Sequence, residues 1–338
     1  MEKLMEGQYM LKEVIFLTSG KEQQKAVDRM KANMGDRSKE CVKIYSSLID
    51  MRKKLRRNKA KIENWKFSNP SLCLHSIRKL DMRKKLRRNK VKDKALFVTD
   101  SPSDLYHLKQ EGMYVAAWLH RQNGQEDLSG AAYAVMDIEE IDWEALERIY
   151  LRLAGKPWTV METGRCMVRE MTVEDVEAFY RIYAEPSITY YMEDLFPEIE
   201  EEREYTRNYI EKIYGFYGYG LWSIVCKENQ EVIGRAGLSW REGFDTPELG
   251  FVIGVPYQRK GYAYEVCKAI IAYGEEELGF EKIQALVREG NEASACLCRE
   301  LGFWKEDRVE DKGVWYERYV KRADAFFFDD LSGSRDVE

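Results

Sequence analysis

The stretch Gln258-Arg259-Lys260-Gly261-Tyr262-Ala263 decides how the second half of this chain is interpreted. It follows an apolar, strand-like run from Leu249 to Val255 and opens a long helical run from Tyr262 to Leu278. The unpaired N–H groups of a first helical turn attract anions, the helix dipole favours negative charge there, and Gly261 lets the backbone approach without a Cβ. The stretch, with its two basic residues, therefore predicts a pyrophosphate cradle. For the loop taken alone, an ordinary strand-to-helix turn is the alternative.

Further motifs flank this loop in a fixed order. Glu248-Leu249-Gly250-Phe251-Val252-Ile253 precedes it, while Asn291-Glu292-Ala293-Ser294 and Glu300-Leu301-Gly302-Phe303 follow after one helix and one strand. This order resembles the GNAT-type N-acetyltransferases, and within them the branch that includes the ribosomal-protein alanine acetyltransferases. The resemblance covers roughly residues 165 to 321. It implies a splayed mixed sheet and acetyl-CoA as the co-substrate.

The resemblance also implies a cofactor site. Backbone groups of the Phe-Val-Ile segment would pair with the pantetheine arm, with one N–H facing the thioester oxygen, and the Gly261 loop would hold the pyrophosphate. The Asn-Glu-Ala-Ser helix start would contact the distal part of the cofactor, although a plain N-cap is an equal alternative for its Asn. The residues implicated are Phe251, Val252, Ile253, Gln258, Arg259, Lys260, Gly261, Tyr262, Ala263, Asn291 and Ser294.

Acetyl transfer to an amine needs a base, because an amine with a pKa near 10 is almost wholly protonated at neutral pH. The resemblance makes Glu248 the candidate, and the alternative is a surface residue at the edge of its strand. Many related enzymes place a Tyr as leaving-group acid a few residues before Leu-Gly-Phe, where this chain has Cys298. A thiol can donate a proton, but a buried Cys is more often inert packing, so another acid, solvent or no acid at all stays open.

The acceptor pocket is expected among aromatic residues near the substrate loops of the family. Two segments, 190–192 and 214–222, are rich in Tyr and Gly. Aromatic walls with a few hydroxyls suit a small amphipathic or cationic acceptor, while core packing with flexible turns explains the same residues equally well. The candidates for substrate binding are Tyr191, Tyr217, Tyr219 and Trp222.

Length and composition suit a two-domain protein of ordinary globular character. The chain has 338 residues and a net charge of −5, and no apolar stretch approaches the ~20 residues that span a bilayer. The first residues lack a signal-peptide core, so we expect a cytoplasmic protein without a membrane partner. Seven scattered Cys without Cys-x-x-Cys spacing fit a reducing compartment, and the three His lie outside the acetyltransferase region, so no metal is expected there.

A ten-residue basic block occurs twice. Asp50-Met51-Arg52-Lys53-Lys54-Leu55-Arg56-Arg57-Asn58-Lys59 is repeated at 81–90, and the segment 50–94 holds 18 Lys and Arg against 4 Asp and Glu, a net +14. Each block is expected to form a short helix with a narrow apolar stripe. Such charge density can bind nucleic acid, but there are only two copies and the block itself lacks aromatic residues, with Trp65 and Phe67 isolated between the copies, which favours a duplicated, solvated insert at about 50–92.

The first 155 residues alternate strand-like and helical patterns, which predicts a small parallel α/β layer. Strands are expected at 13–18, 95–100, 114–118 and 132–136, a helix at 142–153, and Ser103-Asp104 as N-cap of another helix. Residues 95–155 loosely resemble a haloacid-dehalogenase-like Rossmannoid half-domain. The nucleophilic Asp of that family has no counterpart in Leu17-Thr18-Ser19-Gly20, so we expect no phosphatase chemistry, and Asp100 is expected to be a capping or loop carboxylate.

The sequence thus predicts an α/β protein with three parts. These are a small, non-catalytic, Rossmann-like domain at 1–155, a GNAT domain at 156–322 and a mobile tail at 323–338. The expected function is acetyl-CoA-dependent N-acetylation of a primary amine on a small molecule or a protein N-terminus. The alternative is a non-catalytic CoA-binding or interaction protein tethered to nucleic acid through the basic repeat.

Overall fold

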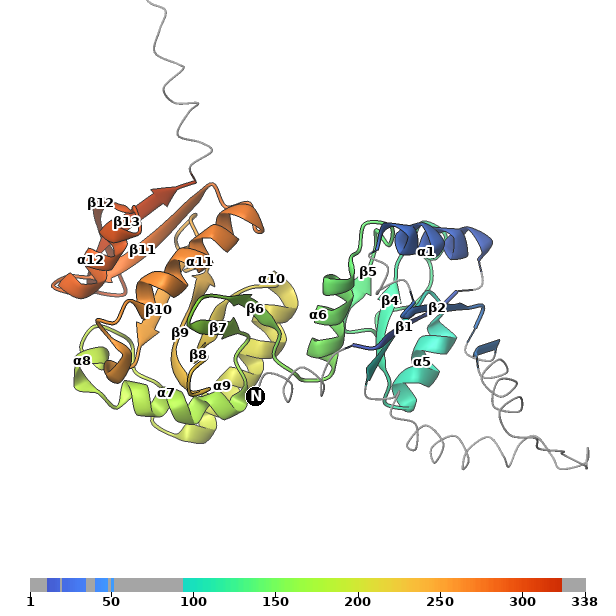
Figure 1. Cartoon of the computed structure of the whole chain (residues 1–338), viewed down its shortest axis with the longest axis horizontal. Helices are drawn as coiled ribbons and strands as arrows, with labels where there is room; N and C mark the ends of the chain where they lie inside the picture. Colours follow the sequence, from blue (N-terminus) through green and yellow to red (C-terminus); the bar gives the residue numbers. More distant parts are fainter. Residues whose placement is uncertain (1–10, 19, 35–39, 48–49, 52–93, 324–338) are drawn as a thin grey trace, which may run out of the picture. The chain divides into compact units, whose positions relative to one another are not determined.

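The computed structural model describes residues 11–18, 20–34, 40–47, 50–51 and 94–323. The chain divides into two compact units, Met1–Lys156 and Pro157–Glu338. Each unit is built around its own sheet and is described by itself (Figure 1). The basic insert from residue 52 onward, including the second copy of the repeat, and the tail from residue 324 lie outside the described residues.

Unit 1 has one fully parallel sheet with strand order β2-β1-β3-β4-β5. Its central strands are continuous apolar runs with every residue of β3 buried, as expected for a parallel sheet covered on both faces. The predicted parallel α/β layer is therefore confirmed. The strands are β1 (Glu13–Leu17), β2 (Val42–Tyr45), β3 (Ala95–Thr99), β4 (Tyr114–Trp118) and β5 (Ala134–Val135). The short edge strand β2 was not predicted.

Helices cover both faces of this sheet. On α1 (Lys21–Asn33) the buried positions 23, 26, 27 and 30 follow the helical period, and the last three of them share one apolar cluster with α6 (Trp143–Leu153). The other face packs against α5 (Pro102–Gln110). Its N-cap is Ser101, whose side chain accepts from the Asp104 N–H, so the predicted cap at Ser103-Asp104 is wrong. Pro102 takes the first helical position, which its fixed φ favours.

The first copy of the repeat starts on the surface of unit 1. Met51 is buried in the same apolar cluster as the α5 face, and its N–H donates to the Ser47 carbonyl at 3.0 Å. The block is therefore anchored at its beginning rather than wholly solvated.

Unit 2 contains an eight-stranded sheet with order β12-β13-β11-β10-β9-β8-β7-β6. All neighbours are antiparallel except β10 and β11, so the predicted mixed sheet is confirmed. The strands are β6 (Thr159–Glu162), β7 (Cys166–Arg169), β8 (Leu221–Cys226), β9 (Val232–Ser239), β10 (Glu248–Ile253), β11 (Lys282–Arg288), β12 (Trp304–Asp311) and β13 (Val314–Arg322). The edge strand β6 was not predicted from the sequence.

The helices of unit 2 follow the expected order between these strands. Thr172 and Asp175 form a capping box at the start of the first of them. The helical segments are η3 (Val173–Asp175), α7 (Val176–Tyr183), α8 (Pro186–Thr189), α9 (Ile199–Tyr209), η4 (Ile210–Tyr214), α10 (Gly215–Tyr217), η5 (Val255–Tyr257), α11 (Tyr262–Glu276) and α12 (Glu292–Glu300).

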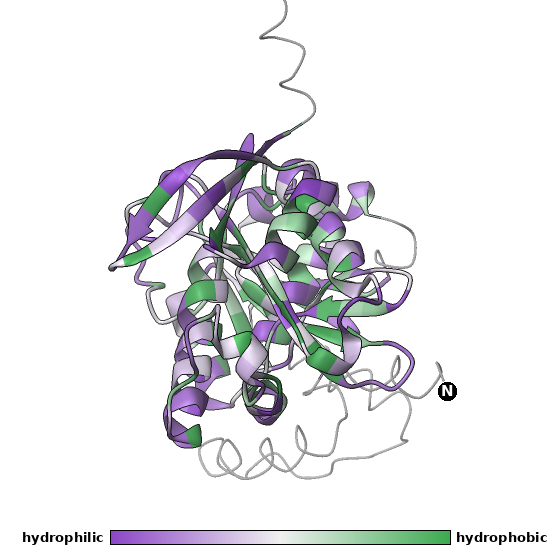
Figure 2. Ribbon diagram, turned by 90° about the vertical axis from the view of Figure 1, so that its left-hand side faces the viewer, coloured by the Kyte–Doolittle hydropathy of each residue, from purple (hydrophilic) through white to green (hydrophobic). Residues whose placement is uncertain are grey.

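The core of unit 2 lies between the sheet and α11. Val266, Cys267, Ile270 and Ile271 of that helix are buried in one apolar cluster with inward-facing residues of the central strands. A Cβ on Gly274 would lie only 2.7 Å from a Leu238 methyl group, so a glycine is needed for this close approach. Figure 2 shows apolar residues along the central strands and mainly hydrophilic ones along the β12–β13 hairpin.

Candidate active site

The sheet of unit 2 opens between its two parallel strands. β10 and β11 share only the pair Glu248 and Gln284, after which no further register is formed. The Gln284 N–H donates to the Pro247 carbonyl at 2.9 Å, so odd-numbered residues of β10 direct their backbone groups toward β11. Phe251 and Ile253 therefore present N–H and C=O groups to the opening. Figure 1 shows these strands in orange at the centre of unit 2.

The three predicted strand residues do not behave alike. Val252 pairs with Arg235 of β9, so its backbone belongs to that ladder and its side chain packs with α7 residues. Ile253 already uses its carbonyl, which accepts from Gln258 Nε2 at 2.8 Å. This leaves the N–H and C=O of Phe251 as the strand groups best placed for a ligand arm in the opening.

The loop after β10 ends at the N-terminus of α11. Gly261 is the N-cap residue with φ +80°, a left-handed conformation that favours glycine, and no side chain caps this helix. Arg259 has a positive φ of 56°, which a non-glycine residue adopts only at a cost. The N–H groups of the first turn, including that of Ala263, point out of the helix because no earlier turn supplies carbonyls. The loop thus has the backbone of an anion site.

Arg165, in the turn between β6 and β7, braces this loop and was missed from the sequence. It donates through Nη1 to the Lys260 carbonyl at 2.8 Å and through Nε to Glu265 at 2.7 Å. Its guanidinium also lies over the Tyr262 ring at 4.3 Å. A Cβ on Gly261 would come within 3.3 Å of Nη2. Only tertiary structure brings Arg165 here, since 95 residues separate it from Lys260.

Glu265 places a negative charge in the first turn of α11, close to the proposed anion site. Burial opposes its ionisation, but hydrogen bonds from Thr163 and from the backbone and side chain of Arg165 lower its pKa. The hydrogen bond to Glu265 in turn raises the pKa of Arg165. Arg165 therefore neutralises a carboxylate that would otherwise repel an anionic ligand.

Glu248 lies inside a partly buried ion cluster. Its two oxygens accept from Arg241 Nε at 2.6 Å and Nη2 at 3.1 Å, and Arg241 Nη1 donates to Asp311 at 2.7 Å. Only 8% of Glu248 is exposed, so the alternative of a surface residue is wrong. The hydrogen bond from Arg241 to Glu248 is the main cause that raises the pKa of Arg241. A base role for Glu248 requires one of these bonds to be exchanged for the acceptor amine.

Cys298 is fully buried in the core of unit 2, on α12. Burial raises the pKa of its thiol to about 12. These properties favour the packing alternative over proton donation to a leaving thiolate. Asn291 caps the same helix, because its side-chain oxygen accepts from the Ser294 N–H at 3.1 Å. Its contact with a cofactor stays a prediction.

The four aromatic candidates lie in different surroundings. Tyr191 donates to the Gly290 carbonyl at 2.9 Å and so ties its segment to the β11–α12 loop. Tyr217 is 46% exposed, whereas Tyr219 is almost buried and accepts from Trp240 Nε1 at 2.5 Å. Trp222 has no exposed area, packs edge-on against Tyr273 and belongs to the core. Tyr191 and Tyr217 remain as candidates that an acceptor could reach.

The described part of the chain shows neither a metal-ligand cluster nor a membrane-spanning helix. No group of three or more potential metal-ligating His, Cys, Asp or Glu side chains occurs among the described residues. Within the same residues, no helix is both long and apolar enough to cross a membrane.

Comparison with known proteins defines the class of unit 2. Residues 165–304 match the acetyltransferase (GNAT) domain. The chain is 30% identical over 154 residues to the uncharacterized N-acetyltransferase YoaA of Bacillus subtilis, covering 44% of this chain and 84% of that protein. It is also 30% identical over 172 residues to the uncharacterized N-acetyltransferase p20 of Bacillus licheniformis, covering 49% and 92%.

The chain therefore belongs to the GNAT family of N-acetyltransferases, as its motifs predict. Among solved structures, it aligns with a ribosomal-protein-S5-alanine acetyltransferase from Vibrio fischeri at 18% identity and a TM-score of 0.43. That alignment covers 48% of this chain and 96% of the other.

Proposed function

We propose that this protein transfers the acetyl group of acetyl-CoA to a primary amine of a small molecule or a protein N-terminus. The observation that carries the proposal is the single pair between β10 and β11, with a helix N-terminus headed by Gly261 after β10. An open strand edge suits the amide-bearing pantetheine arm, and first-turn N–H groups suit a pyrophosphate.

The residues around Gly261 fit a diphosphate group. Backbone N–H groups of the first turn would donate to it, the charges of Arg259 and Lys260 would attract it, and Arg165 cancels the charge of Glu265. Donors of this kind match the strong acceptor oxygens of phosphate. Acetyl-CoA would supply an activated thioester carbonyl for attack by the amine.

Phe251 would orient the thioester through its free backbone N–H, as a donor to the carbonyl oxygen on which negative charge develops. Glu248 would accept the proton that the acceptor ammonium group must lose before the neutral amine attacks the thioester. During this exchange Asp311 would keep Arg241 in place, because it holds a guanidinium nitrogen that Glu248 does not use. The cluster could thus release one Glu248 oxygen without losing its cation.

An acceptor screen tests this proposal. Full-length protein is incubated with acetyl-CoA and amines of each class, namely polyamines, aminoglycosides, amino acids and peptides with free N-termini, and released thiol is measured. We expect turnover with at least one class and thermal stabilisation by CoA. Stabilisation without thiol release from any amine would instead indicate a CoA-binding protein without catalysis. Absence of both effects would contradict the proposed cofactor site.

A further inference from the structure

Unit 1 carries a cluster of polar side chains where open α/β sheets form a crevice, beyond the carboxyl ends of their strands, and the acetyltransferase function does not use this cluster. In its sheet the chain passes from β1 to β2 on one side and then returns to β3 on the other, so the carboxyl ends of β1 and β3 form a topological switch point. Ligands of open α/β sheets bind at such points. Thr18 directly follows β1 and Asp100 directly follows β3, and Thr18 Oγ1 donates to Asp100 Oδ2 at 2.5 Å.

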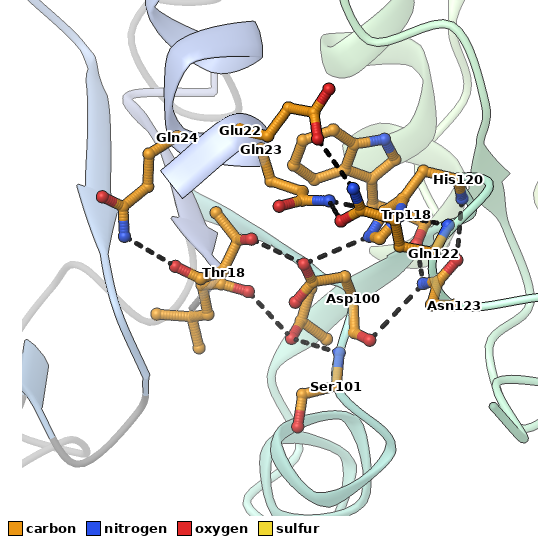
Figure 3. A network of polar contacts seen from close by, with 12 residues as sticks. Thr18, Glu22, Gln23, Gln24, Asp100, Ser101, Trp118, His120, Gln122 and Asn123 are labelled. Atoms are coloured by element: carbon orange, nitrogen blue, oxygen red, sulfur yellow. Dashed lines mark hydrogen bonds and ion pairs between the residues drawn. The ribbon is translucent and has the colours of Figure 1, made fainter. Parts of the chain in front are cut away.

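A chain of amide hydrogen bonds has a fixed direction at this crevice (Figure 3). Glu22 can only accept when ionised, so Gln122 Nε2 donates to it, at 2.7 Å. Gln122 Oε1 then accepts from Gln23 Nε2. Gln23 Oε1 is left as a buried acceptor without a partner among the described residues, although Gln23 is only 6% exposed.

This orphan oxygen lies at the turn between β1 and α1. A Cβ placed on Gly20 would come within 1.7 Å of it, so Gln23 Oε1 sits directly against Gly20, the N-cap residue of α1. Trp118 Nε1 is also buried without a partner, but in Figure 3 it lies on the side of the indole ring turned away from Asp100. The unsatisfied group facing the strand ends is therefore an acceptor.

His120 donates a second hydrogen bond to Asp100 and so determines which of its carboxylate oxygens is left without a partner. The imidazole Nδ1 accepts from the Gln122 N–H at 3.2 Å, so the proton resides on Nε2, which donates to Asp100 Oδ2 at 3.3 Å. Asp100 Oδ2 thus takes both neighbours, Thr18 and His120. Asp100 Oδ1 has no partner among the described residues, and no Lys or Arg there pairs with this carboxylate, whose side chain is only 11% exposed.

The crevice consequently holds a surplus of acceptors and an uncompensated negative charge. Buried acceptors without partners and buried charges without counterions are unfavourable, so a ligand that supplies N–H donors and positive charge would complete the site. We propose that this crevice binds the ammonium or guanidinium group of a small ligand, with Asp100 Oδ1 and Gln23 Oε1 as its acceptors. A metal ion fits less well, because among the described residues no three metal-ligating carboxylate, His or Cys side chains converge.

The site can be tested with a reporter that unit 2 does not contain. The three histidines are His75, His107 and His120, so imidazole ¹H–¹⁵N correlations report on unit 1 alone. Full-length protein is titrated with propylammonium chloride, with propan-1-ol as the neutral probe, and His75→Gln and His107→Gln variants assign the His120 signals by elimination. We expect saturable shifts of the His120 signals with the ammonium probe only.

Two variants of the crevice and one matched control complete the test. Asp100→Asn removes the charge and should weaken propylammonium binding at least 10-fold, while Gln23→Met removes the orphan acceptor and should weaken it several-fold. Asp127→Asn removes a carboxylate that bonds only Ser129 and should leave the affinity unchanged.

Three results would overturn the proposal. They are an equal response to propan-1-ol, unchanged affinity in both crevice variants, or His120 shifts that appear with magnesium chloride or inorganic phosphate and not with propylammonium. Failure of acetyl transfer would leave this test unaffected, because the reporter and the variants lie in unit 1.

Discussion

Both sheets of this protein place polar groups at the carboxyl ends of their strands. In unit 2 these groups are hydrogen-bond donors and cations, whereas in unit 1 they are acceptors and an anion. At the carboxyl end of β10, unit 2 presents helix N–H groups together with Arg259, Lys260 and Arg165. At the carboxyl ends of β1 and β3, unit 1 presents the oxygens of Asp100 and Gln23. Strand ends leave room for a ligand in both cases, and the side chains decide whether that ligand is an anion or a cation.

The largest effect should come from obstructing the loop at Gly261, whose backbone N–H groups are proposed to bind the diphosphate of CoA. Gly261→Val forces a β-branched residue into φ +80° and brings its side chain against Arg165, so the affinity for CoA should fall by at least ~100-fold. Gly279→Val is the matched control, because Gly279 also has a positive φ, 68°, but no heavy atom lies within 4 Å of its Cβ position. Calorimetry with CoA measures both. Equal losses would mean that backbone strain, rather than the cradle, limits binding.

The catalytic carboxylate should come next. Glu248→Gln should lower kcat by roughly 10²-fold at neutral pH, the scale expected for loss of a general base. Asp311→Asn removes the other carboxylate that bonds Arg241 and should reduce kcat only a few-fold. The rate is measured from pH 6 to 9 for both. Similar losses in the two variants would make the cluster structural rather than catalytic.

Replacing Arg165 tests how much positive charge at the loop contributes to CoA affinity. Arg165→Met should weaken CoA binding by about 10-fold, because a donor is lost and Glu265 is left uncompensated. The KM for acetyl-pantetheine, which lacks the diphosphate, should not change. Adding Glu265→Gln should restore part of the affinity. Full restoration would assign Arg165 to charge compensation alone, and an equal loss with acetyl-pantetheine would contradict a role at the diphosphate.

Cys298 tests whether a buried thiol makes the free energy of unfolding depend on pH. Its folded pKa of about 12 lies above the ordinary thiol value near 8.5, so its contribution to stability is complete below about pH 8.5 and is lost as the pH rises toward 12. Between pH 9 and 11 the wild type should lose up to about 1.4 kcal/mol per pH unit more than Cys298→Ala. Urea unfolding at each pH measures this. At pH 7, kcat of the variant should stay within ~2-fold of wild type. A larger loss would favour Cys298 as the acid that protonates the leaving thiolate.

The smallest effect is expected from shortening the basic insert. Deleting Asp50 to Leu80 joins Ile49 to the second copy, so Met82 takes the place of the buried Met51. Loop length alone changes closure entropy by only about 0.6 kcal/mol per doubling, so stability and acetyl transfer should be nearly unchanged. Binding to duplex and single-stranded nucleic acid is titrated with salt for both forms. A steep salt dependence of the wild type that is lost on deletion would instead favour a nucleic-acid tether.

The strongest local patterns were sufficient to predict most elements. The continuous apolar runs at β1, β3, β8 and β10 indicate strands, and the long run of helical periodicity at α11 indicates a helix, with little ambiguity. Short edge strands such as β2 and β6 escaped because four residues with partial burial carry almost no periodic signal. The cap of α5 was misplaced because Ser101 and Ser103 are both plausible caps, and Pro102 decided between them.

The sequence by itself determined the family, the order of the elements and the position of Gly261, because these depend on local chemistry read along the chain. Tertiary structure alone decided which side chains meet. It placed Arg165 beside Lys260, paired Glu248 with Arg241, which also binds Asp311, and buried Trp222 and Cys298. It also left Gln23 and Asp100 with unused oxygens. Charge balance and burial are sums over residues far apart in sequence, so no local pattern contains them.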